Sequence, residues 1–298
     1  MKNSKVLIIG KNGQLAQALL SQARLFDFYQ LSAFDRRELD ITDFDKLEAV
    51  ISELKPDIVI NTSSLQVMLQ CESDPIQAFH INFLAVQNLA ELCKAHQALL
   101  VTFSTDYVFA GSENKLNSET DHSKPLQIYG LSKLAGEYAA LSIYSEGVYV
   151  IRTCGLYGGL SGSPDKGNFV LNILKESQED KPLIEVSSEQ IVSPTYASDL
   201  ARAVFALLQA DAEKGLYHLV NEGSCSWYEF TREIFRLAGV AKELRPINRG
   251  GHSSNANRPL FSALANTKAK ALGIILPTWQ DGLKSYIEFL QASGLLKK

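Results

Sequence analysis

The chain has 298 residues and a net charge of −4, and it is 46% hydrophobic and 21% charged. These values are ordinary for a globular protein and argue against an intrinsically disordered chain. The charge excludes the broad basic surface of a nucleic-acid-binding or membrane-surface protein, so neither partner is expected. The length predicts one large domain, or a domain with a smaller lobe.

Strand and helix patterns alternate through the first half of the chain. Short apolar runs predict buried strands, and apolar residues at three- or four-residue spacing predict helices. The predicted strands are 5–10, 28–34, 57–61, 99–104 and 148–152, and the predicted helices are 13–24, 43–54, 75–95 and 126–144. The strands are nearly continuous Val, Ile and Leu, which predicts a parallel sheet covered on both faces. Right-handed crossovers then give a Rossmann-type, doubly wound α/β fold.

A glycine-rich turn joins the first predicted strand to the first helix, and it reads Gly10-Lys-Asn-Gly13-Gln-Leu-Ala16. Glycines let the backbone turn tightly and approach a pyrophosphate, with the helix N-terminus facing the anion. The alternative is an ordinary turn. The position at the first strand-to-helix junction favours a dinucleotide site.

The second predicted strand ends in a carboxylate followed by a guanidinium. Asp35 lies 25 residues after Gly10, where an acid that binds the cofactor ribose is expected. A carboxylate favours NADH, whereas Arg36 beside it favours NADPH by pairing with the 2′-phosphate. Both cofactors are therefore expected, and the preference stays open.

Three side chains predict carbonyl reduction. Thr105 follows the strand at 99–104, and ligand sites in parallel sheets lie beyond the strand C-termini. Tyr129 and Lys133 are four residues apart in a predicted helix, so they share one face. The ammonium is expected to lower the pKa of the phenol, which can then give a proton to a carbonyl oxygen as hydride arrives. For the Tyr–Lys spacing alone, a surface helix pair is the alternative.

After Thr153 the alternation ends in two irregular stretches, 155–167 and 248–259, separated by further elements. The predicted elements are a strand at 215–220 and helices at 168–178, 198–210, 226–238 and 281–290. Ser226 and Glu229 predict a capping box for the third of these helices. We expect a Rossmann domain of residues 1–155 plus 195–220, and a smaller mixed α/β substrate lobe of residues 156–194 and 221–298.

The cysteines and histidines predict no special chemistry. The four cysteines have no CxxC spacing and are expected to be reduced thiols. The five histidines lack metal-ligand spacing, so no catalytic metal is expected. The first residues run straight into a strand pattern without a signal-peptide core, and no apolar window approaches ~20 residues. We therefore expect a cytoplasmic protein without a membrane span.

Taken together, these motifs resemble the dTDP-4-dehydrorhamnose reductase family of the extended short-chain dehydrogenases/reductases. The resemblance covers nearly the whole chain. Its other marks are Leu39-Asp-Ile-Thr-Asp43, Pro56-Asp-Ile-Val-Ile-Asn61, Ser104-Thr-Asp-Tyr-Val-Phe109, Tyr129-Gly-Leu-Ser-Lys-Leu-Ala-Gly-Glu137, Ile151-Arg-Thr153, Asn168-Phe-Val170, Gln190-Ile-Val-Ser-Pro-Thr195, Ser226-Trp-Tyr-Glu-Phe230 and Arg258-Pro259.

The resemblance implies reduction of the C4 ketone of a dTDP-4-keto-6-deoxy sugar by NADPH or NADH, in nucleotide-sugar and cell-surface polysaccharide synthesis. It implies a homodimer as one possible assembly, and catalytic roles for Thr105, Tyr129 and Lys133. The implied cofactor contacts are Gly10, Asn12, Gly13, Gln14, Leu15, Asp35, Arg36, Asp40, Ile41, Thr62, Ser63, Ser64, Tyr129 and Lys133. The implied substrate contacts are Thr105, Asp106, Tyr107, Asn168, Gln190 and Arg258.

Three departures from the family pattern concern the expected sugar pocket. Leu69 and Gln70 stand where the family usually has an Asp-Lys pair. Gly155 stands where it has a tryptophan expected to touch the sugar, and Ala110 replaces a residue that is often Asp or Pro. The loss of an indole widens a pocket and removes apolar contact surface. The reaction type is therefore predicted more firmly than the sugar.

Other functions remain open at this point. One is a reductase of a different 4-keto sugar nucleotide. Another is a non-catalytic, NADP-binding regulatory subunit, because the β subunit of methionine adenosyltransferase resembles the same family. A third is an epimerase or dehydratase, although Tyr107 rather than Glu after Asp106 favours reduction.

Overall fold

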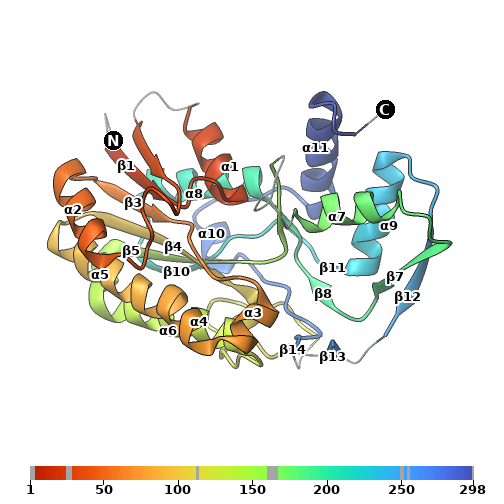
Figure 1. Ribbon diagram of the computed structural model, residues 1–298, viewed down its shortest axis with the longest axis horizontal. Coiled ribbons are helices and arrows are strands. Elements are labelled where there is room, and N and C mark those ends of the chain that lie inside the picture. The colour runs from red at the N-terminus through yellow and green to blue at the C-terminus, as the bar shows by residue number, and fades with distance from the viewer. Residues whose placement is uncertain are drawn as a thin grey trace.

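A parallel sheet forms the centre of the molecule. The computed structural model describes residues 4–24, 29–111, 114–159, 167–248, 252–253 and 256–296. Within them, a six-stranded sheet has the order β10-β5-β4-β3-β1-β2 with every pair parallel (Figure 1). Its strands are β1 (Ser4–Ile9), β2 (Tyr29–Phe34), β3 (Ile58–Asn61), β4 (Leu99–Thr105), β5 (Val148–Thr153) and β10 (Gly215–His218). The chain direction across the sheet reverses between β1 and β3, which leaves a crevice beyond their C-terminal ends.

Helices cover both faces of this sheet because its strands are apolar on both sides. In β1, Val6 and Ile8 pack against one layer, and Leu7 and Ile9 pack against the other. The first layer contains α1 (Gln14–Ala23) and α8 (Ala197–Gln209). The second contains α2 (Phe44–Leu54), α5 (Ala85–Ala95) and α6 (Ile128–Tyr144). The predicted doubly wound fold is confirmed.

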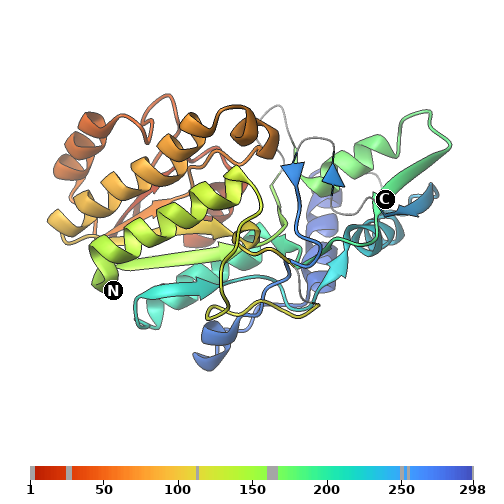
Figure 2. The same cartoon turned by 90° about the horizontal axis from the view of Figure 1, so that it is seen from below.

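A smaller lobe lies beside the carboxyl ends of the strands (Figure 2). Its core gathers aromatic and aliphatic residues of α7 (Phe169–Glu176), α9 (Trp227–Ala238) and α11 (Trp279–Ala292). A parallel pair, β7 (Leu183–Ser187) with β12 (Glu243–Ile247), completes it. The expected mixed α/β lobe is confirmed. Its boundaries stay a prediction, and α10 (Thr267–Ala271), within the expected lobe, packs Ala269 into the core of the sheet.

Most predicted elements are present within a residue or two of their expected ends. The capping box of α9 is formed by Ser226 and Glu229 as predicted. The helix predicted at 75–95 is divided into α4 (Pro75–Phe79), a π-helical turn η1 (His80–Leu84) and α5. The sequence did not predict α3 (Met68–Ser73), α10, the β7–β12 pair, the single-turn 3₁₀ helices η2 (Asp106–Val108) and η3 (Ser145–Gly147), or the two-residue strands β6 (Leu156–Tyr157), β8 (Ile191–Val192), β9 (Thr195–Tyr196), β11 (Cys225–Ser226), β13 (His252–Ser253) and β14 (Ala256–Asn257).

Some predictions lie outside the described residues. These are the start of the second strand at Phe28 and large parts of the irregular stretches 155–167 and 248–259. In the part of the chain that is described, no helix combines the length and the apolarity needed to cross a bilayer.

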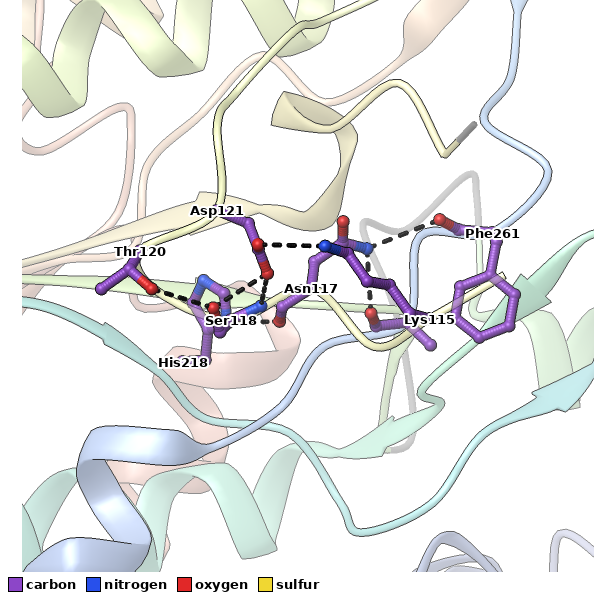
Figure 3. Close-up of polar contacts among 8 residues, drawn as sticks. Lys115, Asn117, Ser118, Thr120, Asp121, His218 and Phe261 are labelled. Atoms are coloured by element: carbon purple, nitrogen blue, oxygen red, sulfur yellow. Dashed lines mark hydrogen bonds and ion pairs between the residues drawn. The ribbon is translucent and has the colours of Figure 1, made fainter. Parts of the chain in front are cut away.

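The loop that contains Asn117 connects the end of β10 with the segment around Ala263 and Ala265 through hydrogen bonds (Figure 3). The backbone N–H and the side-chain amide of Asn117 donate to the carbonyl of Ala263, at 2.9 and 3.1 Å. The Nδ1 of His218, at the end of β10, lies 3.2 Å from the carbonyl oxygens of both Asn117 and Ala265. A ring between two carbonyl acceptors must carry its proton on Nδ1. Burial also lowers the pKa of His218, which keeps the ring neutral, and this histidine joins three separate segments.

Candidate active site

A cavity of about 550 Å³ opens at the carboxyl ends of the sheet strands, between the sheet and the lobe. All fourteen residues expected to contact the cofactor line this cavity: Gly10, Asn12, Gly13, Gln14, Leu15, Asp35, Arg36, Asp40, Ile41, Thr62, Ser63, Ser64, Tyr129 and Lys133. The cavity thus coincides with the crevice where the strand order reverses.

The glycine loop at one end of the cavity fits a pyrophosphate. Gly10 has a φ of +93°, and a Cβ there would lie 2.7 Å from the Oγ1 of Thr62. The Thr62 hydroxyl is held in place because it donates to the carbonyl of Ile9 at 2.7 Å. Gly13 caps α1 without a side chain that could accept from the first turn. The backbone N–H groups of that turn are therefore available to an anion.

Directly after β2, a carboxylate and a guanidinium, those of Asp35 and Arg36, line the cavity. Asp35 accepts hydrogen bonds from the backbone N–H groups of Glu38 and Arg37, which lower the pKa of its carboxyl. The side-chain amide of Asn12 donates to its other oxygen at 3.2 Å. Arg36 is largely exposed and pairs through Nε with Asp40 at 3.0 Å. A ribose and a 2′-phosphate would both find partners here, in keeping with either nicotinamide cofactor.

Thr105, Tyr129 and Lys133 come together on the cavity wall. Thr105 ends β4, while Tyr129 and Lys133 lie one turn apart on α6. Gln127 begins α6, because its side chain accepts from the backbone N–H of Gly130 at 3.1 Å. The Thr105 hydroxyl lies close enough to the phenol of Tyr129 to lower its pKa. The structure therefore places a hydroxyl, a phenol and an ammonium on the wall of one cavity, as the sequence predicted.

The pKa values of these groups differ from the sequence-based expectation. Burial raises the pKa of Tyr129, and the neighbouring hydroxyl of Thr105 offsets this only in part. Burial also lowers the pKa of Lys133 to about 8, against the opposing charge of Glu137. The lowered pKa that we expected for Tyr129 is not found, because burial of the phenol outweighs the groups that lower it. A raised pKa keeps the phenol protonated, as a proton donor requires.

Thr105 belongs to a buried polar cluster that also contains Asp106 and Ser262. Asp106 accepts hydrogen bonds from the hydroxyl of Ser262 at 2.5 Å and from Thr105 at 3.2 Å. Burial raises the pKa of Asp106 to about 6, and these hydrogen bonds oppose the shift. Asp106 and Tyr107 line the cavity, as predicted for substrate contacts.

The other predicted substrate contacts are not among the residues that line the cavity. Asn168 begins α7, where it accepts from the backbone N–H of Leu171 and donates to the hydroxyl of Tyr286 at 2.8 Å. Gln190 is buried next to β8. The charge of Arg258 lies close enough to lower the pKa of Tyr107, which burial raises overall. Substrate-binding roles for Asn168, Gln190 and Arg258 stay predictions.

Of the residues that depart from the family pattern, Gly155 lies at the cavity, whereas Leu69 and Gln70 do not. Gly155 lines the cavity. Leu69 and Gln70 are exposed on α3 and do not line it, so their expected influence on the pocket is not supported by their position. Their neighbours Leu65 and Gln66 line the cavity instead.

Several cavity residues were not predicted from the sequence. Ser104 and Thr153 have buried hydroxyls without a hydrogen-bond partner, and both line the cavity. Thr153 is the register partner of Thr105 across β4 and β5, so its position at a strand end could have indicated it. Trp227 lines the cavity on the side of the lobe. The others are Leu39, Leu65, Gln66, Ile81, Phe103, Leu156 and Val192.

The cysteine and histidine side chains do not form a metal site in the part of the chain that is placed. No group of three or more His, Cys, Asp or Glu side chains in that part could hold a metal ion. All four cysteines are buried and free.

Comparison with known proteins agrees with this geometry. Residues 4–292 match the family model described as the RmlD substrate binding domain. A dTDP-4-dehydrorhamnose reductase of Aggregatibacter actinomycetemcomitans is 32% identical, with 95% of this chain and 98% of that protein aligned. A spore coat polysaccharide biosynthesis protein of Bacillus subtilis is 33% identical over 96% of this chain and 97% of its own. The crystal structure of dTDP-4-dehydrorhamnose reductase from Bacillus anthracis in complex with NADP superposes with a TM-score of 0.90, at 32% identity, covering 97% of this chain and 100% of that one.

Proposed function

The chain belongs to the RmlD substrate binding domain family, and from this membership we propose that it is a reductase that uses NADPH or NADH to reduce the C4 ketone of a dTDP-4-keto-6-deoxy sugar. The observation that carries the proposal is a single cavity shared by the glycine loop and by Thr105, Tyr129 and Lys133. Because one cavity holds both sets, a reduced nicotinamide and a carbonyl can meet beside the phenol. The reaction belongs to nucleotide-sugar synthesis for polysaccharides, and the relative from Bacillus subtilis is named for such a process.

Tyr129, Thr105 and Lys133 have separate roles in the proposed reduction. The nicotinamide, when bound, supplies the hydride that reaches the C4 carbon. Tyr129 holds the proton for the carbonyl oxygen, and its raised pKa keeps that proton in place until the oxygen becomes negative. Thr105 orients the phenol and can donate to the same oxygen. Lys133, with a pKa of about 8, is mostly charged at neutral pH and can hold the ribose hydroxyls of the cofactor.

The test follows the loss of reduced-nicotinamide absorbance with dTDP-4-keto-6-deoxy sugars of defined configuration. We expect turnover with NADPH or NADH, and a fall of about 10²- to 10⁴-fold in kcat for Tyr129→Phe, since one proton donor is removed. Tyr138→Phe is the matched control, because Tyr138 lies on the same helix but is exposed and outside the cavity. Equal activity of Tyr129→Phe and the unaltered protein would overturn the assigned role.

A different keto sugar is favoured as a second candidate by Gly155. This glycine lines the cavity where the family pattern has a tryptophan, so the substrate can be bulkier or differently configured. A panel of dTDP-, UDP- and GDP-linked 4-keto sugars compared by kcat/KM distinguishes the two candidates. Tight cofactor binding without turnover of any sugar in the panel would instead support a regulatory subunit.

The assembly and location of the protein are part of the same proposal. Four buried, free cysteines are in keeping with a reducing cytoplasm. The homodimer implied by the family resemblance stays a prediction, which sedimentation of the purified chain tests.

A further inference from the structure

The cavity continues past the reacting side chains to a wall that the smaller lobe provides. On this side it is lined by Gly155, Leu156, Val192 and Trp227, none of which is charged. The opposite end contains the glycine loop with Asp35 and the other polar groups expected to bind the cofactor. The two ends therefore differ in chemistry, and the lobe wall suits an uncharged ligand surface.

Trp227 and Gly155 meet on this wall. A Cβ at Gly155 would lie 3.3 Å from Cη2 of Trp227 and 3.3 Å from the Cα of Pro194. That is tighter than most real Cβ contacts. Gly155 also has a φ of +52°, a backbone conformation that residues other than glycine rarely adopt. The glycine thus leaves room for the indole of Trp227 to reach the cavity, and a side chain at this position would displace it.

The fold fixes the indole before any ligand arrives. Trp227 is the first residue of α9, directly after the capping residue Ser226, whose hydroxyl accepts from the backbone N–H of Glu229 at 3.1 Å. Its ring packs against Phe169 with a centroid distance of 4.3 Å. Pairing of β11 with β8 places Cys225 opposite Val192, which brings the helix start to the cavity wall. An aromatic side chain held in this way loses little entropy on binding.

We propose that Trp227 is the platform on which the hexose ring of the sugar nucleotide rests, with Gly155 providing the space. This inference rests on the proposed function and adds a specificity-determining residue to it. A 6-deoxyhexose presents C–H groups on a ring face and a methyl group at C6, which match the negative face of an indole. Hydroxyl groups on the other face remain free for the polar side chains near Thr105. The contact selects the sugar, not the nucleotide.

Fluorescence can test the contact without turnover. The chain has two tryptophans, and the second, Trp279, is buried in the lobe core and does not line the cavity. In a Trp279→Phe variant, all indole emission comes from Trp227. We expect the emission to change when the variant, saturated with NADP⁺, is titrated with dTDP-L-rhamnose. We expect no matching change with dTDP alone, with binding of each ligand followed by calorimetry.

The outcomes of this titration separate the alternatives. The Trp227→Phe variant, which keeps only Trp279, is the matched control and should give no change. An unchanged emission in Trp279→Phe at saturating dTDP-L-rhamnose overturns the proposal. An equal change with dTDP alone also overturns it, because the indole would then contact the nucleotide.

Kinetics give an independent measurement. Trp227→Leu should raise the KM for the sugar nucleotide about 10-fold, while the KM for NADPH stays unchanged. Trp227→Phe should restore most of the loss because an aromatic face remains. A purely structural role would instead lower thermal stability and weaken both ligands together. An unchanged sugar KM in an active Trp227→Leu protein overturns the platform and leaves the reductase standing. Absence of turnover in the unaltered protein overturns the reductase, and the titration then still decides the platform.

Discussion

At the scale of single residues, Lys133 carries a charge that its surroundings disfavour. Burial lowers its pKa from 10.5 to about 8, so the ammonium is lost as the pH rises through 8. We expect kcat/KM for NADPH to fall above about pH 8, because the free protein then lacks the cation that holds the cofactor. Initial rates across roughly pH 6 to 10 measure this. Lys133→Arg, which stays charged, should retain its own rate to higher pH, and an equal fall in both proteins would contradict the assignment.

The lowered pKa of Lys133 also makes the free energy of unfolding depend on pH. The folded pKa of Lys133 lies below the unfolded value, so the unfolded chain binds more protons between about pH 8 and 10.5. This residue therefore destabilises the fold while it is charged, by about 3 kcal/mol from 2.5 pKa units. Lys133→Met should inactivate the protein without lowering its urea midpoint at neutral pH. A large decrease in that midpoint would show that the ammonium has a stabilising partner.

Gly10 offers a second prediction at this scale. Its φ is +93°, and the Cβ of an alanine would lie only 2.7 Å from the Oγ1 of Thr62, so alanine is unfavourable there. We expect Gly10→Ala to lower the free energy of unfolding by about 1 to 2 kcal/mol and to weaken NADPH binding at least tenfold. Fluorescence titration with NADPH measures the affinity. Gly239→Ala, at a helix end with a φ of +67° and open space around it, shares the backbone strain and should leave NADPH affinity unchanged.

At the scale of elements, a buried ion pair holds α6 against the sheet. Glu137 of α6 accepts two hydrogen bonds from Arg152 of β5, at 2.9 and 2.6 Å, and both side chains are almost fully buried. Glu137→Ala leaves an unpaired buried guanidinium, which should lower stability by about 3 to 5 kcal/mol. Arg236→Ala removes a 2.6 Å pair with Glu233 on the surface of α9 and should cost at most about 1 kcal/mol. Urea unfolding measures both, and similar losses would contradict the role of burial.

The elements also show what the sequence could predict. The strands of the sheet follow from local apolar runs, and α9 follows from its capping residues. The β7–β12 pair could not be predicted, because its two strands are separated by more than fifty residues and are partly exposed. The π-helical turn at His80–Leu84 keeps a helical apolar pattern, so a periodicity of about 3.6 residues does not reveal it.

The sequence could also predict one part of the candidate site and not the other. Thr105 and the glycine loop lie at the ends of sheet strands, and Tyr129 and Lys133 lie on α6, which packs against that sheet, so the topology brings them together. Trp227 could not be placed from sequence, because its approach to Gly155 depends on how β11 and β8 pair.

At the scale of the whole molecule, His218, which connects the segments of Asn117 and Ala265 to β10, makes the stability of the fold sensitive to acid. Burial, with the charge of Arg152, lowers its pKa to about 3, below the ordinary 6.5. The unfolded chain therefore takes up a proton first, and the stability from this residue is lost as the pH falls from about 6.5 to 3. By pH 5 the loss is about 2 kcal/mol.

Asp106 acts in the opposite direction below about pH 6, because its folded pKa is raised. Comparison with His218→Asn cancels that effect, since both proteins contain Asp106. We expect urea midpoints of the unaltered chain to fall more steeply between about pH 7 and 5 than those of His218→Asn. Parallel curves would contradict the assignment.

The chain alternates between its two main cores. Residues 157, 170–186 and 196 contribute to the core of the lobe and 197–219 to that of the sheet. Residues 225–237 return to the lobe, 269–276 to the sheet, and 279–290 to the lobe again. A single crossover within residues 197–290 would therefore join parts of two cores from different parents, because neither core is built from one continuous segment. A point substitution beside the cavity, at Gly155 for example, can alter the pocket and leave every one of these chain connections intact.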